Sequence, residues 1–116
     1  MSDHETKLRR LAIHDERLYG QALCGSDTDP PRSLDARSSD IARLAALIAS
    51  DAPETTYAPV ISAGLGDGLT PDELVDVLIA VIPIVGSARA GSAAPRLAAA
   101  LDYDLERGLE DLGPTG

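Results

Sequence analysis

The chain has one cysteine, no tryptophan and no phenylalanine. A lone Cys24 excludes an intramolecular disulfide, a Cys-x-x-Cys redox pair and a cysteine metal cluster. Aromatic residues make up only 3% of the sequence, so the core must consist of Ala, Leu, Val and Ile, which suits closely packed helices better than a sheet sandwich. The two histidines, His4 and His14, do not have metal-site spacing with the carboxylates, so we expect no metal and no cofactor.

Basic residues are also scarce. The chain has 10 Lys and Arg against 19 Asp and Glu, a formal net charge of −9, which opposes binding to nucleic acid and to an anionic membrane. The longest uncharged apolar run, 77–88, is too short for a membrane span and contains Pro83 and Gly86. The N-terminus is charged and lacks the apolar segment of a signal peptide. We therefore expect a cytoplasmic protein with neither nucleic acid nor membrane as a partner.

What the sequence does contain is helical periodicity. Apolar residues recur at helical spacing, and no stretch shows the alternation typical of a strand. The 116 residues, with 44% hydrophobic and 25% charged, predict one domain over 1–116. We expect its core at 34–101 and a flexible tail at 105–116. The predicted fold class is all-α, a bundle of about five to six helices.

The clearest helix is predicted over 71–85. Thr70 and Glu73 have the spacing of a capping box, with Pro71 at the first helical position. Residues 74–82 are apolar nearly all round, so this helix is expected to be covered by neighbours on most sides. Pro83 should kink or end it, and Gly86 should separate it from the next helix.

Four further helical stretches flank this central helix. The first is predicted as one helix over 4–23, followed by a loop at 24–33. Asp35 is the expected N-cap of the next helix, which stops near Ser50. A third helix begins either after an Asp51 cap or at Thr56. The last, over 87–101, is rich in Ala and Gly, and Pro95 should bend or divide it.

From Leu34 onward the chain resembles the carboxymuconolactone decarboxylase family, which shares its fold with alkyl hydroperoxidase D. The resemblance is carried by the stretches LDARSSDIARLAALIAS and APVISAGLGDGLTPDELVDVLIAVIPIVGSARA, above all by the G-x-T-P-x-E-L turn and the later Gly-x-x-Arg-Ala step. It implies an alkyl hydroperoxidase D-like helical bundle. It also implies assembly into a homotrimer or homohexamer, with pockets for a small-molecule ligand near the subunit contacts.

The reactive residues of that family are missing here. In its peroxidase branch a Glu precedes a Cys pair and a His, and the corresponding positions hold Pro53, Thr56 and Val60, with Asp40 near the place of the Glu. Dithiol peroxide reduction requires an attacking thiolate and a second, resolving thiol. A single Cys24 cannot supply both, so peroxidase activity is supported by family descent only.

Five residues are candidates for a site. Arg89 could hold a substrate carboxylate, and His14 could donate a proton to an enolate if packing turns it inward, with Asp40 as the nearby carboxylate. Tyr57 and Ser62 could line a substrate pocket. The alternatives are an ion pair between Arg89 and a carboxylate such as Asp40, a solvated histidine and a core tyrosine.

Three functions follow as hypotheses. One is a non-redox lyase or isomerase acting on a small carboxylate or ketone without a cofactor. Another is a catalytically silent module that binds a small molecule or assembles with a partner. The third is a peroxidase. A pocket containing Arg89 and a second polar group would favour an enzyme, whereas a filled bundle interior would favour a module.

Overall fold

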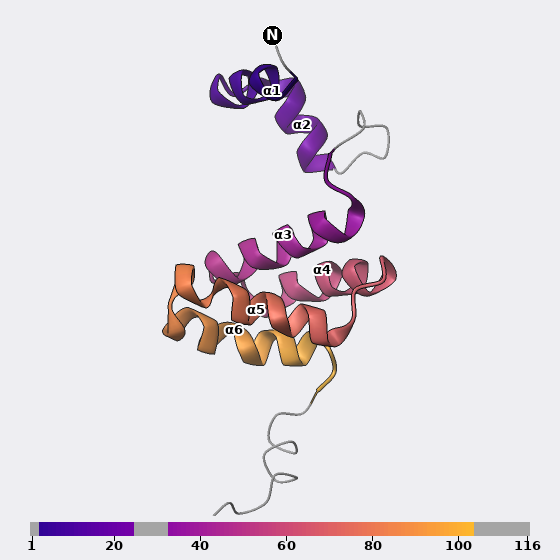
Figure 1. Cartoon of the computed structure of the whole chain (residues 1–116), viewed down its shortest axis with the longest axis vertical. Helices are drawn as coiled ribbons and strands as arrows, with labels where there is room; N and C mark the ends of the chain where they lie inside the picture. The colour runs from indigo at the N-terminus through magenta and orange to yellow at the C-terminus, as the bar shows by residue number, and fades with distance from the viewer. Residues whose placement is uncertain (1–2, 25–32, 104–116) are drawn as a thin grey trace, which may run out of the picture. The chain divides into compact units, whose positions relative to one another are not determined.

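The computed structural model describes residues 3–24 and 33–103, and the regular elements in these ranges are α-helices (Figure 1). The all-α prediction is confirmed for this part of the chain. The chain divides into two compact units, Met1–Ser33 and Leu34–Gly116. The predicted tail over 105–116 and most of the predicted loop over 24–33 lie outside the described residues. None of the helices in the described ranges has the length and hydropathy needed to cross a bilayer.

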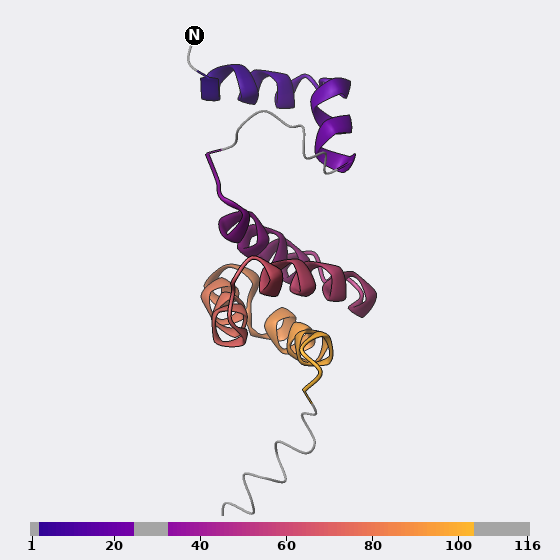
Figure 2. The same cartoon turned by 90° about the vertical axis from the view of Figure 1, so that its right-hand side faces the viewer.

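The first unit contains two helices where the sequence predicted one helix over 4–23. They are α1 (Asp3–Ala12) and α2 (Glu16–Cys24), and α2 leaves α1 at a steep angle (Figure 2). His14 adopts a left-handed backbone conformation with φ of 54°. Its amide donates to the carbonyl of Leu11 at 3.2 Å, and the amide of Asp15 donates to that of Arg10 at 3.0 Å. These two bonds form a Schellman motif, which ends a helix.

Asp15 then starts α2. Its Oδ1 accepts hydrogen bonds from the amides of Arg17 at 3.0 Å and Leu18 at 3.3 Å, the pattern of an N-cap. Its Oδ2 accepts from Nε of Arg10 at 2.9 Å. The Arg10 hydrogen bond, with those of the two amides, holds the pKa of Asp15 below its usual value. One carboxylate therefore joins the end of α1 to the beginning of α2.

The second unit contains α3 (Ala36–Ala49), α4 (Glu54–Gly66), α5 (Pro71–Val85) and α6 (Ser87–Ala100). Both α3 and α6 pack against α4 and against α5 (Figure 1). The core between these four helices consists of aliphatic and small side chains with one aromatic ring. Its members are Leu44, Ile48, Tyr57, Ile61, Leu69, Leu74, Val77, Leu78, Ala90, Ala93 and Leu97.

The predicted capping box at α5 is confirmed. The amide of Glu73 donates to Oγ1 of Thr70 at 3.1 Å, and the amide of Thr70 donates to Oε1 of Glu73 at 3.0 Å. The expectation that neighbours cover this helix on most sides is wrong for the single chain. Leu74, Val77 and Leu78 are buried, whereas the opposite residues leave a large apolar surface exposed.

α5 spans Pro71–Val85 as predicted and ends two residues after Pro83, whereas α6 runs through Pro95 and is not divided there. Gly86 alone separates these two helices, with φ of 87° and ψ of 161°. α4 begins at Glu54, between the two predicted starts, and Pro59 lies inside it.

Three helices of the second unit end in the same way as α1. Residues in the left-handed conformation follow α3, α4 and α6, namely Asp51 with φ of 54°, Gly68 with φ of 95° and Asp102 with φ of 58°. Each is followed by an amide that bonds back five residues, as Ala52 does to Leu47 at 3.1 Å. Two of these positions hold an aspartate where glycine is usual, so they carry backbone strain.

Candidate functional site

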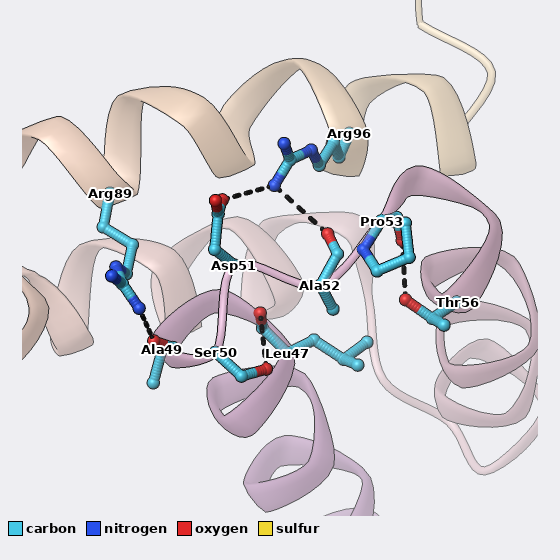
Figure 3. Close-up of polar contacts among 9 residues, drawn as sticks. All are labelled: Leu47, Ala49, Ser50, Asp51, Ala52, Pro53, Thr56, Arg89 and Arg96. Atoms are coloured by element: carbon cyan, nitrogen blue, oxygen red, sulfur yellow. Dashed lines mark hydrogen bonds and ion pairs between the residues drawn. The ribbon is translucent and has the colours of Figure 1, made fainter.

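Arg89 joins two helices. It lies in the first turn of α6, and its Nη1 donates a hydrogen bond to the carbonyl oxygen of Ala49, the last residue of α3 (Figure 3). The final carbonyls of a helix have no partner within it, and they form the negative end of its dipole. The guanidinium of Arg89 therefore gives a carbonyl at the end of α3 a hydrogen-bond donor and places a positive charge at the negative end of the helix dipole. Asp40, the carboxylate expected to pair with Arg89, has Arg43 as its partner instead.

Arg96, which the sequence analysis did not single out, makes the second contact of this kind. Its Nη1 lies 2.6 Å from Oδ1 of Asp51 and donates at 3.1 Å to the carbonyl of Ala52 (Figure 3). It lies seven residues after Arg89, two helical turns along the same side of α6. The two arginines together fix the turn between α3 and α4 against α6.

Tyr57 lies in the first turn of α4 and is fully buried. Its hydroxyl has no hydrogen-bond partner. Burial raises the pKa of Tyr57, the charge of Arg96 acts against that rise, and the charge of Asp51 adds to it. The structure therefore brings one predicted substrate-binding residue next to a charged pair, but in the core rather than in a pocket. Ser62, its predicted companion, is exposed on α4.

Pro53 and Thr56, which the predicted resemblance would align with a Cys pair, lie at the start of α4. Oγ1 of Thr56 donates to the carbonyl of Pro53 at 2.6 Å (Figure 3). Pro53 is the N-cap residue of α4 and makes no side-chain cap hydrogen bond. The Thr56 hydroxyl donates to its carbonyl, which does not replace an acceptor for the free amides of the helix start. Both residues thus take part in the local geometry of the helix start.

His14 lies in the first unit, at the break between α1 and α2. It is exposed, and its ring stacks on that of Tyr19 with centroids 5.2 Å apart and planes inclined by 20°. The hydroxyl of Tyr19 donates to the carbonyl of Leu11 at 2.9 Å. The ring stack and this hydrogen bond therefore hold α2 against the end of α1.

Asp40 is the one predicted catalytic residue that the structure buries, with 3% of its surface exposed. Oδ1 lies 3.6 Å from Nη1 of Arg43, and Oδ2 has no hydrogen-bond partner. Burial, aided by the neighbouring carboxylate of Asp67, raises the pKa of Asp40 to about 6. Its Cβ lies beside the buried Gly64 of α4, at 3.9 Å from where a Cβ on that glycine would be.

The described residues do form a groove, elsewhere in the second unit. It has a volume of about 480 Å³ and lies between the first half of α5 and the second half of α6. Its walls are mainly apolar, with Asp72 and the exposed Tyr103 at the edges. The lining consists of Pro71, Asp72, Val75, Leu78, Ala94, Leu97, Ala98, Leu101 and Tyr103. None of the five predicted site residues is among them.

The groove continues into an apolar flank of α5. We define this flank as Val75, Ile79 and Ile82, which recur at i, i+4 and i+7 and therefore share one side of the helix. Their exposed fractions are 41%, 57% and 38%. Large aliphatic side chains exposed in a row are a known mark of an interaction surface.

The predicted site residues do not converge on one cavity. Arg89 binds the carbonyl of Ala49, and Arg96 binds Asp51 and the carbonyl of Ala52. Asp40 and Tyr57 are buried, and neither lines the groove. Among residues 3–24 and 33–103, no three His, Cys, Asp or Glu side chains come together as metal ligands. Comparison with known proteins gives no match to a family model, a curated sequence or a solved structure.

Proposed function

We propose that the second unit is a helical assembly module that pairs with a second copy of this chain through the α5 flank and the adjoining groove. The observation that carries this proposal is the row of three exposed aliphatic residues beside an apolar groove. The resemblance to the carboxymuconolactone decarboxylase family stays part of the proposal, as a statement about descent and not about reaction.

A second copy is the occupant that fits both features at once. The flank is a ridge of branched side chains, and the neighbouring α6 contributes small ones, Ala94 and Ala98, to the groove. A two-fold axis places the ridge of each copy in the groove of the other, which is the self-complementary contact of a symmetric dimer. Such a contact removes from water all three aliphatic side chains on each copy.

Charge is arranged to permit this contact. No residue between Val77 and Ala88 is charged, and the carboxylates of α5's exposed side, Asp72 and Asp76, lie near its N-terminus. If the two α5 helices cross antiparallel, these carboxylates lie at opposite ends of the interface. The repulsion between two acidic chains is thereby kept away from the apolar centre.

The lyase or isomerase hypothesis has less support. It needs a cation for the carboxylate and a proton donor that face one cavity. Arg89 is bound to the end of α3, and the groove lining offers only Asp72 and Tyr103 as polar groups. A pocket that contained Arg89 and a second polar group would favour an enzyme. The groove does not contain Arg89, which favours a module.

The test is the mass of the protein in solution, by light scattering or sedimentation at tens of micromolar. We expect at least twice the chain mass of 12.1 kDa. The trimer or hexamer implied by the family resemblance would require a further contact in addition to the flank. A wild-type protein that stays at the mass of one chain would contradict the proposal.

A matched pair of substitutions locates the interface. Ile79→Glu places a charge at the centre of the flank and should reduce the mass to that of one chain, because an unpaired charge is not tolerated in a dry contact. Ile84 is 87% exposed and lies on another side of α5, so Ile84→Glu should leave the assembly unchanged. Equal effects of the two substitutions would place the contact elsewhere.

A further inference from the structure

The groove between α5 and α6 is also the place to which the chain returns after its last helix. α6 ends at Ala100, and Asp102 follows it in a left-handed conformation with φ of 58°. The amide of Tyr103 donates to the carbonyl of Ala98 at 2.8 Å, the return bond of a Schellman motif. This motif turns the chain away from the axis of α6, and Tyr103 lines the groove. Whatever follows Tyr103 in the sequence therefore starts at the edge of the groove.

The sequence that follows has an apolar pattern of its own. Residues 104–116 read DLERGLEDLGPTG, and their large apolar side chains are three leucines. Leu105, Leu109 and Leu112 recur at i, i+4 and i+7, the spacing of one side of a helix, and a glycine and a proline come directly after them. We call residues 105–112 the leucine segment. A helix this short is not stable in water unless its apolar side is covered.

The groove offers a cover of matching length and character. Its walls are mainly apolar. From Ala94 to Leu101 its α6 wall rises about 10 Å, and the leucine segment has the same rise as a helix. Amphipathic helices bind apolar grooves through side chains at i, i+4 and i+7. The charged residues of the segment fall on the side opposite the leucines, so no charge enters the groove with them.

We propose that the leucine segment binds in the groove of its own chain and competes there with a second copy. The attachment at Tyr103 favours this occupant, because a ligand tethered at the edge of its site has an effective concentration in the millimolar range. A second copy must reach the same groove from solution. The binding of the segment stands on the groove and the tether, whereas the competition rests on the assembly proposed above.

The consequence is that the chain limits its own assembly. While the leucine segment fills the groove, the flank of another copy has no place to enter. The apparent affinity of self-association is then reduced by the fraction of chains whose groove is open. The three leucines therefore help to set the concentration at which two copies pair.

The first experiment tests the binding alone. It uses the full chain with Ile79→Glu, in which we expect no assembly, and compares the methyl NMR signals of the groove with and without a triple substitution, Leu105→Ser, Leu109→Ser and Leu112→Ser. The signals of Val75 and Leu97, which line the groove, should shift. Those of Leu44 and Ile48, which are core residues outside the lining, should not.

The matched control replaces the same three leucines with methionine. These side chains keep the apolar volume and the helix propensity, so the groove signals should stay close to those of the leucine segment. Groove signals that are identical in the serine variant and in its leucine parent would overturn the proposal.

The second experiment tests the competition by sedimentation of the chain with Ile79 intact. The serine substitutions leave the net charge unchanged, so a change in affinity reports the leucines and not repulsion. We expect the dissociation constant of self-association to fall at least about threefold in the serine variant and to stay unchanged in the methionine variant. Equal constants for the wild type and the serine variant overturn the competition. If all three proteins keep the mass of one chain, the proposed assembly and the competition both fail, and the NMR comparison still decides the binding.

Discussion

Nη1 of Arg96 lies 2.6 Å from Oδ1 of Asp51, and that aspartate holds a left-handed backbone conformation with φ of 54°. Asp51, at the end of α3, is therefore also the residue to which Arg96 of α6 binds. A glycine would relieve the strain but remove the ion pair, whereas the aspartate keeps the pair and retains the strain. This relationship leads to the first prediction.

Arg96→Met should lower the thermal midpoint of the second unit by a few degrees, because Asp51 and the Ala52 carbonyl lose their partner. Asp51→Gly should change the midpoint less, since the loss of the ion pair is offset by relief of the left-handed strain. Circular dichroism melting of the two variants checks this. If Asp51→Gly were the more damaging change, the ion pair would outweigh the backbone strain.

Gly86→Ala should destabilise the fold by about 1–3 kcal/mol, because φ of 87° with ψ of 161° is a conformation open essentially to glycine alone. A Cβ at Gly86 would meet no neighbouring atom within 4 Å, so the cost is in the backbone and not in packing. Gly91→Ala is the matched control. It lies inside α6, also without a neighbour within 4 Å, and should stabilise by about 0.5–1 kcal/mol. Urea denaturation of both variants measures the contrast.

Thr70→Ala should cost about 1 kcal/mol, because the amide of Glu73 loses the acceptor of the capping box. Thr70→Ser keeps that oxygen and should stay close to the wild type in the same urea experiment. An alanine variant as stable as the serine one would mean that water replaces the cap at no cost.

Self-association should strengthen with added salt. Each chain carries a net charge of −9, while the proposed contact is apolar, so screening reduces the repulsion without weakening the attraction. We expect the dissociation constant to fall at least about threefold between roughly 20 mM and 500 mM NaCl. Asp76→Asn removes one charge near the flank and should reduce this salt dependence. An assembly that dissociates in salt would instead be held by ion pairs.

The sequence was most informative where the decisive residues are close together in the chain. The capping box of α5 needs only Thr70, Pro71 and Glu73, and Asp35, which caps α3 by accepting from the amide of Ser38 at 2.8 Å, is equally local. Both helix starts could therefore be predicted. The small-residue composition also sufficed to predict an all-α fold.

Helix ends were harder to predict because unusual residues make them. His14, Asp51 and Asp102 occupy left-handed positions at helix ends that usually hold glycine, so these residues gave no signal in the sequence. The first unit was therefore predicted as one helix over 4–23, although the helix ends at a histidine and α2 starts in a new direction. Among the described helices, the ends of α4 and α5 carry the usual signal, Gly68 and Gly86.

Side-chain roles depended on contacts between distant segments. Arg89 was selected for its place beside Gly86, yet Arg96 makes the ion pair, because it is the arginine that α6 presents to the turn after α3. Asp40 was selected for its position relative to the family motif. It is buried where α3 packs against α4, close to Gly64, and no local pattern in the sequence indicates that contact.

α5 and α6 are two long arms joined by a single residue, Gly86, so a change in the backbone angles of Gly86 changes the angle between the two helices. α5 is 15 residues long, about 22 Å of helix, and the groove lies toward the ends far from the joint, where Pro71 faces Leu101 and Tyr103. A rotation of a few degrees about the backbone bonds of Gly86 therefore changes the spacing little beside the joint and most at the tips. The width of the groove therefore depends on the backbone angles of this one glycine as well as on the packing of both helices against α3.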